Sequence, residues 1–143
     1  MIMHSGHAEW NGPFNKGKGT MKPGSSDCQS NYSTGSRFQS DGGSSPEEMI
    51  GAAHAGCFSM ALAHQVQQEG HEPKSISTSA QVTLKQVEDG YSIDRVDLTT
   101  NATIPGIDRE TFMTLANKAK EGCPVSKALS GVTINLNANL DES

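Results

Sequence analysis

Two cysteines of this chain stand in local sequences that favour thiol chemistry. Cys57 lies in the middle of an alanine-rich apolar segment, and Cys123 directly precedes Pro124, where a helix can begin. A thiolate attacks electrophiles, and an oxidised sulfur can condense with a second thiol to form a disulfide. The pair therefore predicts a thiol enzyme, in which one cysteine attacks the substrate and the other resolves the oxidised product.

The two thiols should differ in acidity. Cys123, at a helix start, should feel the positive end of the helix dipole, which favours a thiolate. Burial in an apolar helix should instead raise the pKa of Cys57, so a functional Cys57 needs a cation beside it. Several cations are candidates. Arg37 is the best placed, because we expect it in a short strand just before the Cys57 helix.

Other readings of these residues stay open. His54 lies three residues before Cys57 on the same helix face, and it could be a base, a zinc ligand with Cys57 and Cys123, or a buried core histidine, the reading that we favour. A zinc-binding module would use those three ligands, although the two-residue ligand spacing common in structural zinc sites is absent. Cys28 lies in a polar loop and is interpreted as an incidental exposed thiol.

A passive binding protein is another alternative. Met49, Ile50 and Met60 could line an apolar groove, with the thiols as bystanders. Glu47 has a sufficient structural explanation, because an acidic side chain in the first helical turn complements the helix dipole.

The helix that carries Cys57 is predicted from its ends. Ser45 can cap it, Pro46 suits its first position, Glu48 can close a capping box, and Gly70 should stop it after Glu69. Residues at three- and four-residue steps predict a buried face that includes Cys57. These residues are Met49, Ala52, Ala53, Gly56, Cys57, Met60, Ala61 and His64.

The remaining elements predict an α+β protein whose helices pack on an antiparallel sheet, in a single domain of residues 1–143. Short strands are expected at residues 7–10, 19–22 and 35–38, with a loop at 23–32, and a long hairpin turns at residues 88–90. Asp108 caps a second helix that ends at Gly122, a short helix covers residues 125–129, and residues 132–140 alternate as a closing strand.

Composition narrows the possible partners and the compartment. The net charge of −5 and the lack of a Lys/Arg run argue against nucleic acid and against an anionic membrane surface. The polar amino terminus and the absence of a long apolar run predict a cytoplasmic protein. Only 34% of residues are hydrophobic, so we expect a second subunit to complete the burial.

The segment from Ser45 to Leu62, together with the runs 104–108 and 122–126, closely resembles the OsmC branch of the OsmC/Ohr family, the osmotically inducible and organic-hydroperoxide-resistance proteins. The resemblance covers nearly the whole chain. It implies an intertwined homodimer with two central helices and active sites at the subunit interface. It also implies a thiol peroxidase that reduces organic hydroperoxides, and hydrogen peroxide more weakly, without a metal or other cofactor. An external dithiol, possibly lipoyl, would be the reductant.

The resemblance also implies roles for four residues. Cys57 would be the peroxidatic cysteine and Cys123 the resolving one, while Arg37 and Glu47 would form the polar pair that activates the thiol. Ten residues of helix separate Glu47 from Cys57, which is about 15 Å along the axis. If both serve one site, one of them must come from the partner subunit. We expect the two sulfurs to meet across that same subunit boundary.

Overall fold

The computed structural model describes residues 1–39 and 42–141 of the chain. Two compact units are present, residues 1–49 and residues 50–143. The expectation of a single domain stays a prediction. Within the described ranges, no helix combines the length and the apolar character needed to cross a membrane.

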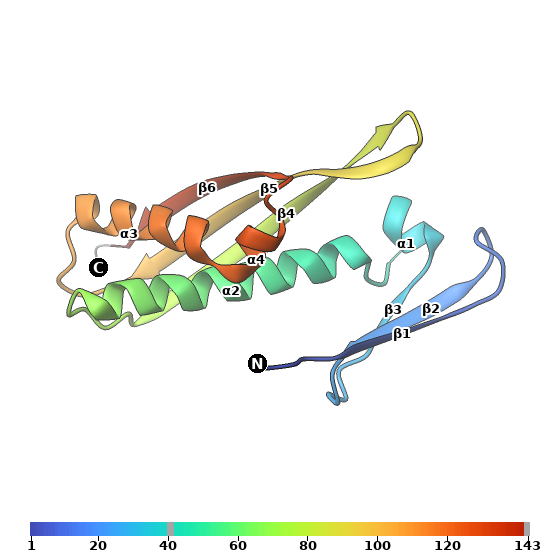
Figure 1. Ribbon diagram of the computed structural model, residues 1–143, viewed down its shortest axis with the longest axis horizontal. Helices are drawn as coiled ribbons and strands as arrows, with labels where there is room; N and C mark the ends of the chain where they lie inside the picture. The colour runs from blue at the N-terminus through green and yellow to red at the C-terminus, as the bar shows by residue number, and fades with distance from the viewer. Residues whose placement is uncertain (40–41, 142–143) are drawn as a thin grey trace. The chain divides into compact units, whose positions relative to one another are not determined.

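The first unit contains a three-stranded antiparallel sheet in the order β1 (Gly6–Asn11), β2 (Lys18–Pro23) and β3 (Ser30–Tyr32) (Figure 1). The two predicted strands at residues 7–10 and 19–22 are confirmed. The third strand falls at the end of the segment predicted as a loop, and it pairs with β2 through only three residues. Such a short strand carries almost no apolar pattern, which explains why the sequence did not indicate it.

The strand predicted at residues 35–38 is wrong, because this segment forms the short helix α1 (Thr34–Phe38). Ser33 caps the helix through a reciprocal pair of hydrogen bonds: the Ser33 hydroxyl accepts from the Ser36 N–H, and the Ser36 hydroxyl accepts from the Ser33 N–H. A capping box of this kind satisfies two backbone donors that would otherwise lack partners. Arg37 therefore projects from a helical turn and not from a strand.

Helix α2 (Pro46–Gln68) begins where the sequence predicts and ends one residue before its predicted end. The Ser45 hydroxyl accepts a hydrogen bond of 3.1 Å from the Glu48 N–H. At the other end, Gly70 has a φ of +86°, and the His71 N–H donates to the Val66 carbonyl over 3.0 Å. This backbone closure needs a left-handed residue, which glycine adopts without a steric penalty.

The buried face of α2 differs from the predicted one. Apart from Glu47 in the first turn, the buried residues are Gly51, His54, Phe58, Leu62 and Val66. Most of the predicted stripe is exposed instead, and Met60 retains 77% of its accessible surface. The physical reason is that α2 is apolar on both sides, so hydrophobic periodicity alone could not select the face that packs inward. Cys57 lies at the edge between the two faces and is half-buried.

The second unit contains a mixed sheet in the order β4 (Ser75–Val87), β5 (Gly90–Thr103) and β6 (Thr133–Leu140). The predicted hairpin is confirmed, since β4 and β5 pair antiparallel. The expectation of a fully antiparallel sheet is wrong, because β6 pairs parallel to β5. Parallel neighbours need a crossover connection, and here helices α3 (Arg109–Gly122) and α4 (Pro124–Ala128) supply it.

Helices α2 and α3 run along the sheet of the second unit (Figure 1). Alternate residues of the strands point toward these helices, and the core consists of side chains from α2, α3, β5 and β6. Its buried members are Phe58, Leu62, Val66, Val96, Leu98, Ala102, Ile104, Phe112, Leu115, Ala116, Ala119 and Ala138. This core holds α2 and α3 against the same face of the sheet, and Cys123 directly follows the end of α3.

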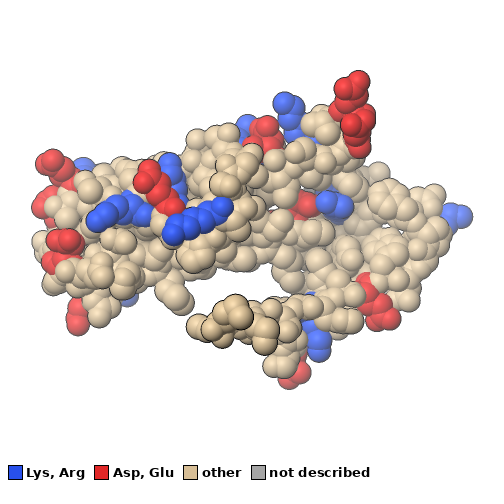
Figure 2. Space-filling view, viewed as in Figure 1, with Lys and Arg blue, Asp and Glu red and all other residues tan. Residues whose placement is uncertain are grey.

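Figure 2 shows Lys, Arg, Asp and Glu side chains scattered over the visible surface, without a block of one sign.

Candidate active site

The two cysteines of the second unit meet. The Cys57 sulfur lies in the middle of α2, the Cys123 sulfur lies between α3 and α4, and the two atoms are 2.8 Å apart and share a hydrogen bond. Both residues are free thiols in this structure. Sulfurs this close can form a covalent bond after oxidation without any large movement of the backbone.

Both sulfurs of this pair belong to one chain, which corrects the expectation that they meet across a subunit boundary. The packing of α2 and α3 on the same sheet explains the difference. Cys123 directly follows Gly122, the last residue of α3, so that helix carries Cys123 to the middle of α2. No sequence pattern indicated how α2 and α3 align along their lengths.

The two thiols differ in acidity in the direction that their local sequences predict. Burial raises the pKa of the Cys57 thiol, and its hydrogen bond with Cys123 raises this pKa further. Burial opposes ionisation of Cys123 as well, but its hydrogen bonds with Cys57 and Ser126 outweigh this effect and hold the Cys123 pKa below its usual range. Cys123 is the N-cap of α4 and accepts from the Ser126 N–H over 3.4 Å. The pair therefore holds negative charge more readily on Cys123.

His54 is a buried core histidine. It has no exposed surface, and its Nε2 atom lies 2.7 Å from the Ser126 hydroxyl oxygen. Its Nδ1 atom is buried and has no hydrogen-bond partner among the described residues. Burial lowers the pKa of the His54 ring, which keeps it neutral near pH 7. Among residues 1–39 and 42–141, no group of three or more His, Cys, Asp and Glu side chains is arranged to hold a metal ion.

Arg37 and Glu47 form an ion pair in the first unit. Nε of Arg37 donates to Oε1 of Glu47 and Nη2 donates to Oε2, each over 2.9 Å. Glu47 is buried, whereas Arg37 is partly exposed. The hydrogen bonds to Glu47 raise the pKa of Arg37, so its charge is permanent. A bidentate pair of this kind fixes the plane of the guanidinium group.

Each pair lies next to a cavity of its own unit. A cavity of about 460 Å³ opens at Cys57, and its walls include Met60, Ala61 and Ala119. In the first unit, a cavity of about 270 Å³ lies beside Arg37. Four aromatic side chains line it, those of Trp10, Phe14, Tyr32 and Phe38.

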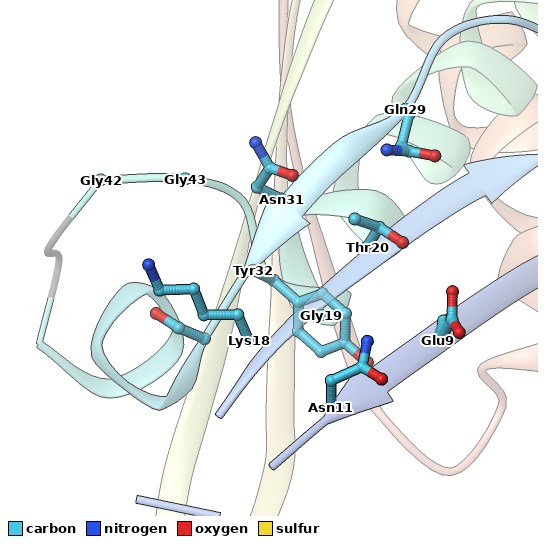
Figure 3. Close-up of a pocket in the computed structure, with 11 residues that line it drawn as sticks. Glu9, Asn11, Lys18, Gly19, Thr20, Gln29, Asn31, Tyr32, Gly42 and Gly43 are labelled. Carbon is cyan, nitrogen blue, oxygen red and sulfur yellow. The ribbon is translucent and has the colours of Figure 1, made fainter. Parts of the chain in front are cut away.

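A third cavity, of about 690 Å³, lies on the sheet of the first unit, and most of the residues that line it carry polar side chains (Figure 3). Figure 3 shows that Glu9 and Asn11 of β1 and Lys18 and Thr20 of β2 contribute to its wall, with Gly42 and Gly43 at its rim. Its lining includes neither a cysteine nor a member of the Arg37–Glu47 pair. We therefore assign it no part in the reaction of the cysteines.

The structure thus brings together Cys57 with Cys123 and Arg37 with Glu47, and the two pairs belong to different units. Cys28 is exposed, as expected for an incidental thiol. Two features were missed from the sequence, namely Ser126 and the aromatic cavity. Ser126 stands three residues after the helix-capping Cys123, a position from which capping side chains are commonly contacted, and this spacing was the available signal.

Comparisons with known proteins show which proteins this chain is similar to. The family model described as OsmC-like protein matches residues 39–137. Peroxiredoxin OsmC of Escherichia coli is 44% identical over 131 residues, which cover 90% of this chain and 92% of that protein. An organic hydroperoxide resistance protein of Xanthomonas axonopodis is 34% identical over 66% of this chain and 67% of that protein. The crystal structure of the organic hydroperoxide resistance protein OhrB of Bacillus subtilis is similar with a TM-score of 0.71 and 26% identity, over 96% of this chain and 98% of that chain.

Proposed function

The chain belongs to the family of OsmC-like proteins, and from this premise we propose that Cys57 and Cys123 carry out its reaction. The protein is a thiol-dependent peroxidase that reduces hydroperoxides. The single observation that carries the assignment to these two residues is the 2.8 Å separation of their sulfur atoms. Cys57 is the peroxidatic residue, because it is half-buried beside an open cavity, whereas Cys123 is fully buried.

The reaction has two chemical steps within the protein. The Cys57 thiolate attacks the terminal peroxide oxygen, the O–O bond breaks, and the alkoxide leaves as the alcohol after taking up a proton. Cys57 is then a sulfenic acid. The Cys123 sulfur attacks the Cys57 sulfur, an S–S bond replaces the S–O bond, and the hydroxide leaves as water. An external dithiol, with a lipoyl group as the candidate, reduces the disulfide by exchange.

Cys57 needs a cation for the first step, since both burial and Cys123 raise its pKa. We assign this role to Arg37, which is held by Glu47. Helix geometry separates Glu47 from Cys57 of the same chain by about 15 Å along α2. The Arg37–Glu47 pair that activates a given Cys57 is therefore assigned to a second copy of the chain.

The exposed face of α2 supports a homodimer. Ala52, Ala53, Gly56 and Met60 are exposed on a helix whose opposite face is already packed in the core. A helix that is apolar on both faces is normally buried on both faces. Small side chains on such a face allow a second backbone to approach closely, and a Cβ atom built on Gly56 meets no other atom within 4 Å. A second copy of the chain fits this face and brings in the second activating pair.

The aromatic cavity beside Arg37 favours organic hydroperoxides over hydrogen peroxide. Its apolar walls can remove the organic part of a substrate from water, while the guanidinium group can bind the peroxide oxygens. Hydrogen peroxide has no apolar part and gains nothing from the cavity. This preference is our proposal for the substrate class.

The test measures turnover of cumene hydroperoxide and hydrogen peroxide with a dithiol reductant. We expect Cys57→Ser to lose at least about a thousandfold in rate, because it removes the nucleophile. The matched control Cys28→Ser changes an exposed thiol and should keep full activity. Undiminished activity of Cys57→Ser would end the assignment. Titration of free thiols after one equivalent of peroxide separates the enzyme from a passive apolar binder: the enzyme loses two thiols per chain and a passive binder loses none.

A further inference from the structure

A buried polar pair next to the sulfurs has no part in the reaction described so far. His54 and Ser126 are both buried, and Nε2 of His54 and the Ser126 hydroxyl oxygen are 2.7 Å apart. Placing a histidine ring in an apolar core costs free energy unless its polar atoms are bonded, and Nδ1 of His54 has no partner among the described residues. The helix packing alone would be better served by an apolar residue at this position.

The pair is connected to the resolving sulfur. The Ser126 N–H donates to the Cys123 sulfur over 3.4 Å. A hydrogen bond from the Ser126 side chain also lowers the pKa of Cys123. Cys123 in turn lies 2.8 Å from the Cys57 sulfur. One line of hydrogen-bonding groups therefore runs from His54 through Ser126 and Cys123 to Cys57.

The number of hydrogen atoms available along this line determines which groups donate and which accept. A thiolate can only accept, so the Ser126 hydroxyl must give its single hydrogen to Cys123 when that sulfur is ionised. The Ser126 oxygen can then bond to Nε2 only as an acceptor. His54 must consequently carry its hydrogen on Nε2, which leaves Nδ1 as a bare nitrogen with no hydrogen to donate. A buried Nδ1 without an acceptor nearby fits this arrangement.

We propose that His54 is a positioning residue which orients the Ser126 hydroxyl toward Cys123 and thereby keeps the resolving sulfur in its thiolate form. This inference rests on the proposed function, in which Cys123 attacks the Cys57 sulfenic acid. In that step the Cys123 thiolate forms the S–S bond, the S–O bond of Cys57 breaks, and the departing hydroxide takes up a proton to become water. His54 itself neither gains nor loses a proton.

The titratable groups around the pair come from three elements. Helix α2 contributes Cys57 and His54, and its His64 lines the cavity at Cys57. Helix α3 contributes Lys118 to the same cavity, and α4 carries the exposed Lys127. Unlike Lys118 and Lys127, His54 reaches Cys123 through a specific hydrogen-bonded neighbour, Ser126. A substitution of His54 that retains a hydrogen-bond donor should therefore behave differently from one that retains only the side-chain volume.

The experiment uses the full chain with Cys28→Ser, and it follows the two steps separately by rapid mixing with one equivalent of cumene hydroperoxide. A hydrogen bond to a charged group is worth about one pKa unit or more. For His54→Leu we expect the pH midpoint of disulfide formation to rise by about one unit, with a roughly tenfold slower rate at pH 7. Formation of the sulfenic acid should not slow, because a Cys123 that holds less negative charge opposes the ionisation of Cys57 less.

Further variants make the test specific. His54→Gln retains a side-chain N–H that can donate to Ser126, so it should restore most of the parent midpoint. Ser126→Ala should shift the midpoint as His54→Leu does, and it serves as the second route if His54→Leu does not fold. The matched control His71→Leu lies beyond the end of α2 and should leave the midpoint unchanged.

Nitrogen-15 NMR of the resting protein gives a readout that is independent of activity. The expected signal is a neutral His54 ring with its hydrogen on Nε2 at pH 7. A ring protonated on both nitrogens, a hydrogen on Nδ1, or an unchanged midpoint in both His54→Leu and Ser126→Ala would overturn the inference. If Cys57→Ser were active, the proposed function would fail instead. The role of His54 alone would be contradicted by a third outcome. In that outcome activity depends on Cys57, the sulfenic acid forms normally, and the pH midpoint of disulfide formation does not shift in the variants.

Discussion

Cys57 occupies a position that opposes its own ionisation. Its thiol is half-buried. The neighbouring Cys123, which caps the N-terminus of α4, competes with Cys57 for the negative charge. This arrangement favours resolution once Cys57 is oxidised, because the second sulfur is ready to attack. It also makes the first step depend on a cation from outside the pair, which is the role proposed for Arg37.

Removal of Cys123 should make Cys57 more acidic. Cys123→Ala deletes the hydrogen bond and the charge that raise the Cys57 pKa, while the burial of Cys57 persists. In a Cys28→Ser background, the pH midpoint for alkylation of Cys57 by iodoacetamide should therefore move to lower pH than in the chain with Cys123. Mass spectrometry of the alkylated peptide against pH measures this midpoint. A midpoint that stays in place or moves upward would show that Cys123 does not set the acidity of Cys57.

Among the helices, the apolar pattern of the sequence predicts the buried face of α3 correctly but not that of α2. Helix α3 has one apolar face, on which Phe112, Leu115, Ala116 and Ala119 recur at three- and four-residue steps, and all four are buried. Helix α2 is apolar around most of its circumference, so the same reasoning selected the wrong face. Helix α2 therefore presents an apolar face that the chain leaves uncovered.

The Asp108 cap at the start of α3 should make the stability of the protein depend on pH. The Asp108 carboxylate accepts from the Thr111 N–H over 2.8 Å and from the Thr111 hydroxyl over 3.0 Å, and these bonds lower the Asp108 pKa. A carboxyl group whose pKa is lower in the folded state stabilises the fold above its unfolded pKa, and it loses this effect as the pH falls through the folded pKa. Asp108→Ala should therefore lower the Tm at pH 7, and its difference from the parent should narrow below about pH 4.

Thermal unfolding followed by circular dichroism from pH 7 to pH 3 measures this difference. The control Glu121→Ala removes an exposed carboxylate near the opposite end of α3, and it should change the Tm little at any pH in this range. A Tm difference for Asp108→Ala that is constant with pH would mean that the charge of the cap contributes nothing.

For the whole molecule, the decisive feature is that the proposed catalytic groups belong to two units. Cys57 and Cys123 are held by the core of the second unit, whereas Arg37 and Glu47 are held by the first. If the site forms between two copies of the chain, one copy supplies the cysteine pair of a given site and the other copy supplies its Arg37–Glu47 pair. Activity should then be recoverable by mixing two inactive variants.

We expect Glu47→Gln and Cys57→Ser homodimers to be nearly inactive when separate. After they are unfolded together and refolded, about half of the dimers should be mixed. Each mixed dimer should contain one site that has an intact Glu47 from one chain and an intact Cys57 from the other. Turnover of cumene hydroperoxide per dimer should recover to about a quarter of the parent value, one active site in half of the dimers.

A mixture of Cys57→Ser with the double variant Glu47→Gln/Cys57→Ser is the matched control, because no pairing of these chains restores a thiol. Absence of recovery in the first mixture, with mixed dimers verified by mass, would contradict a site shared between two chains. A monomer in sedimentation velocity would contradict it as well.

The sequence by itself determined the local features of this protein. The ends of α2, the hairpin of β4 and β5, the cap of α3 and the helix-capping position of Cys123 all depend on residues close together in the chain. Such features follow from hydrogen-bonding partners and dipoles within one or two turns. The predicted strand around Arg37 failed for a local reason as well, since the Ser33 capping box was not recognised.

Only the tertiary structure decided which side of α2 faces the core, that β6 runs parallel to β5, and that the two sulfurs meet within one chain. The same is true of the contact between His54 and Ser126, which are 72 residues apart. These outcomes depend on how α2, α3 and the sheet align along their lengths. That alignment is set by the fit of many side chains at once, which no single segment of the sequence encodes.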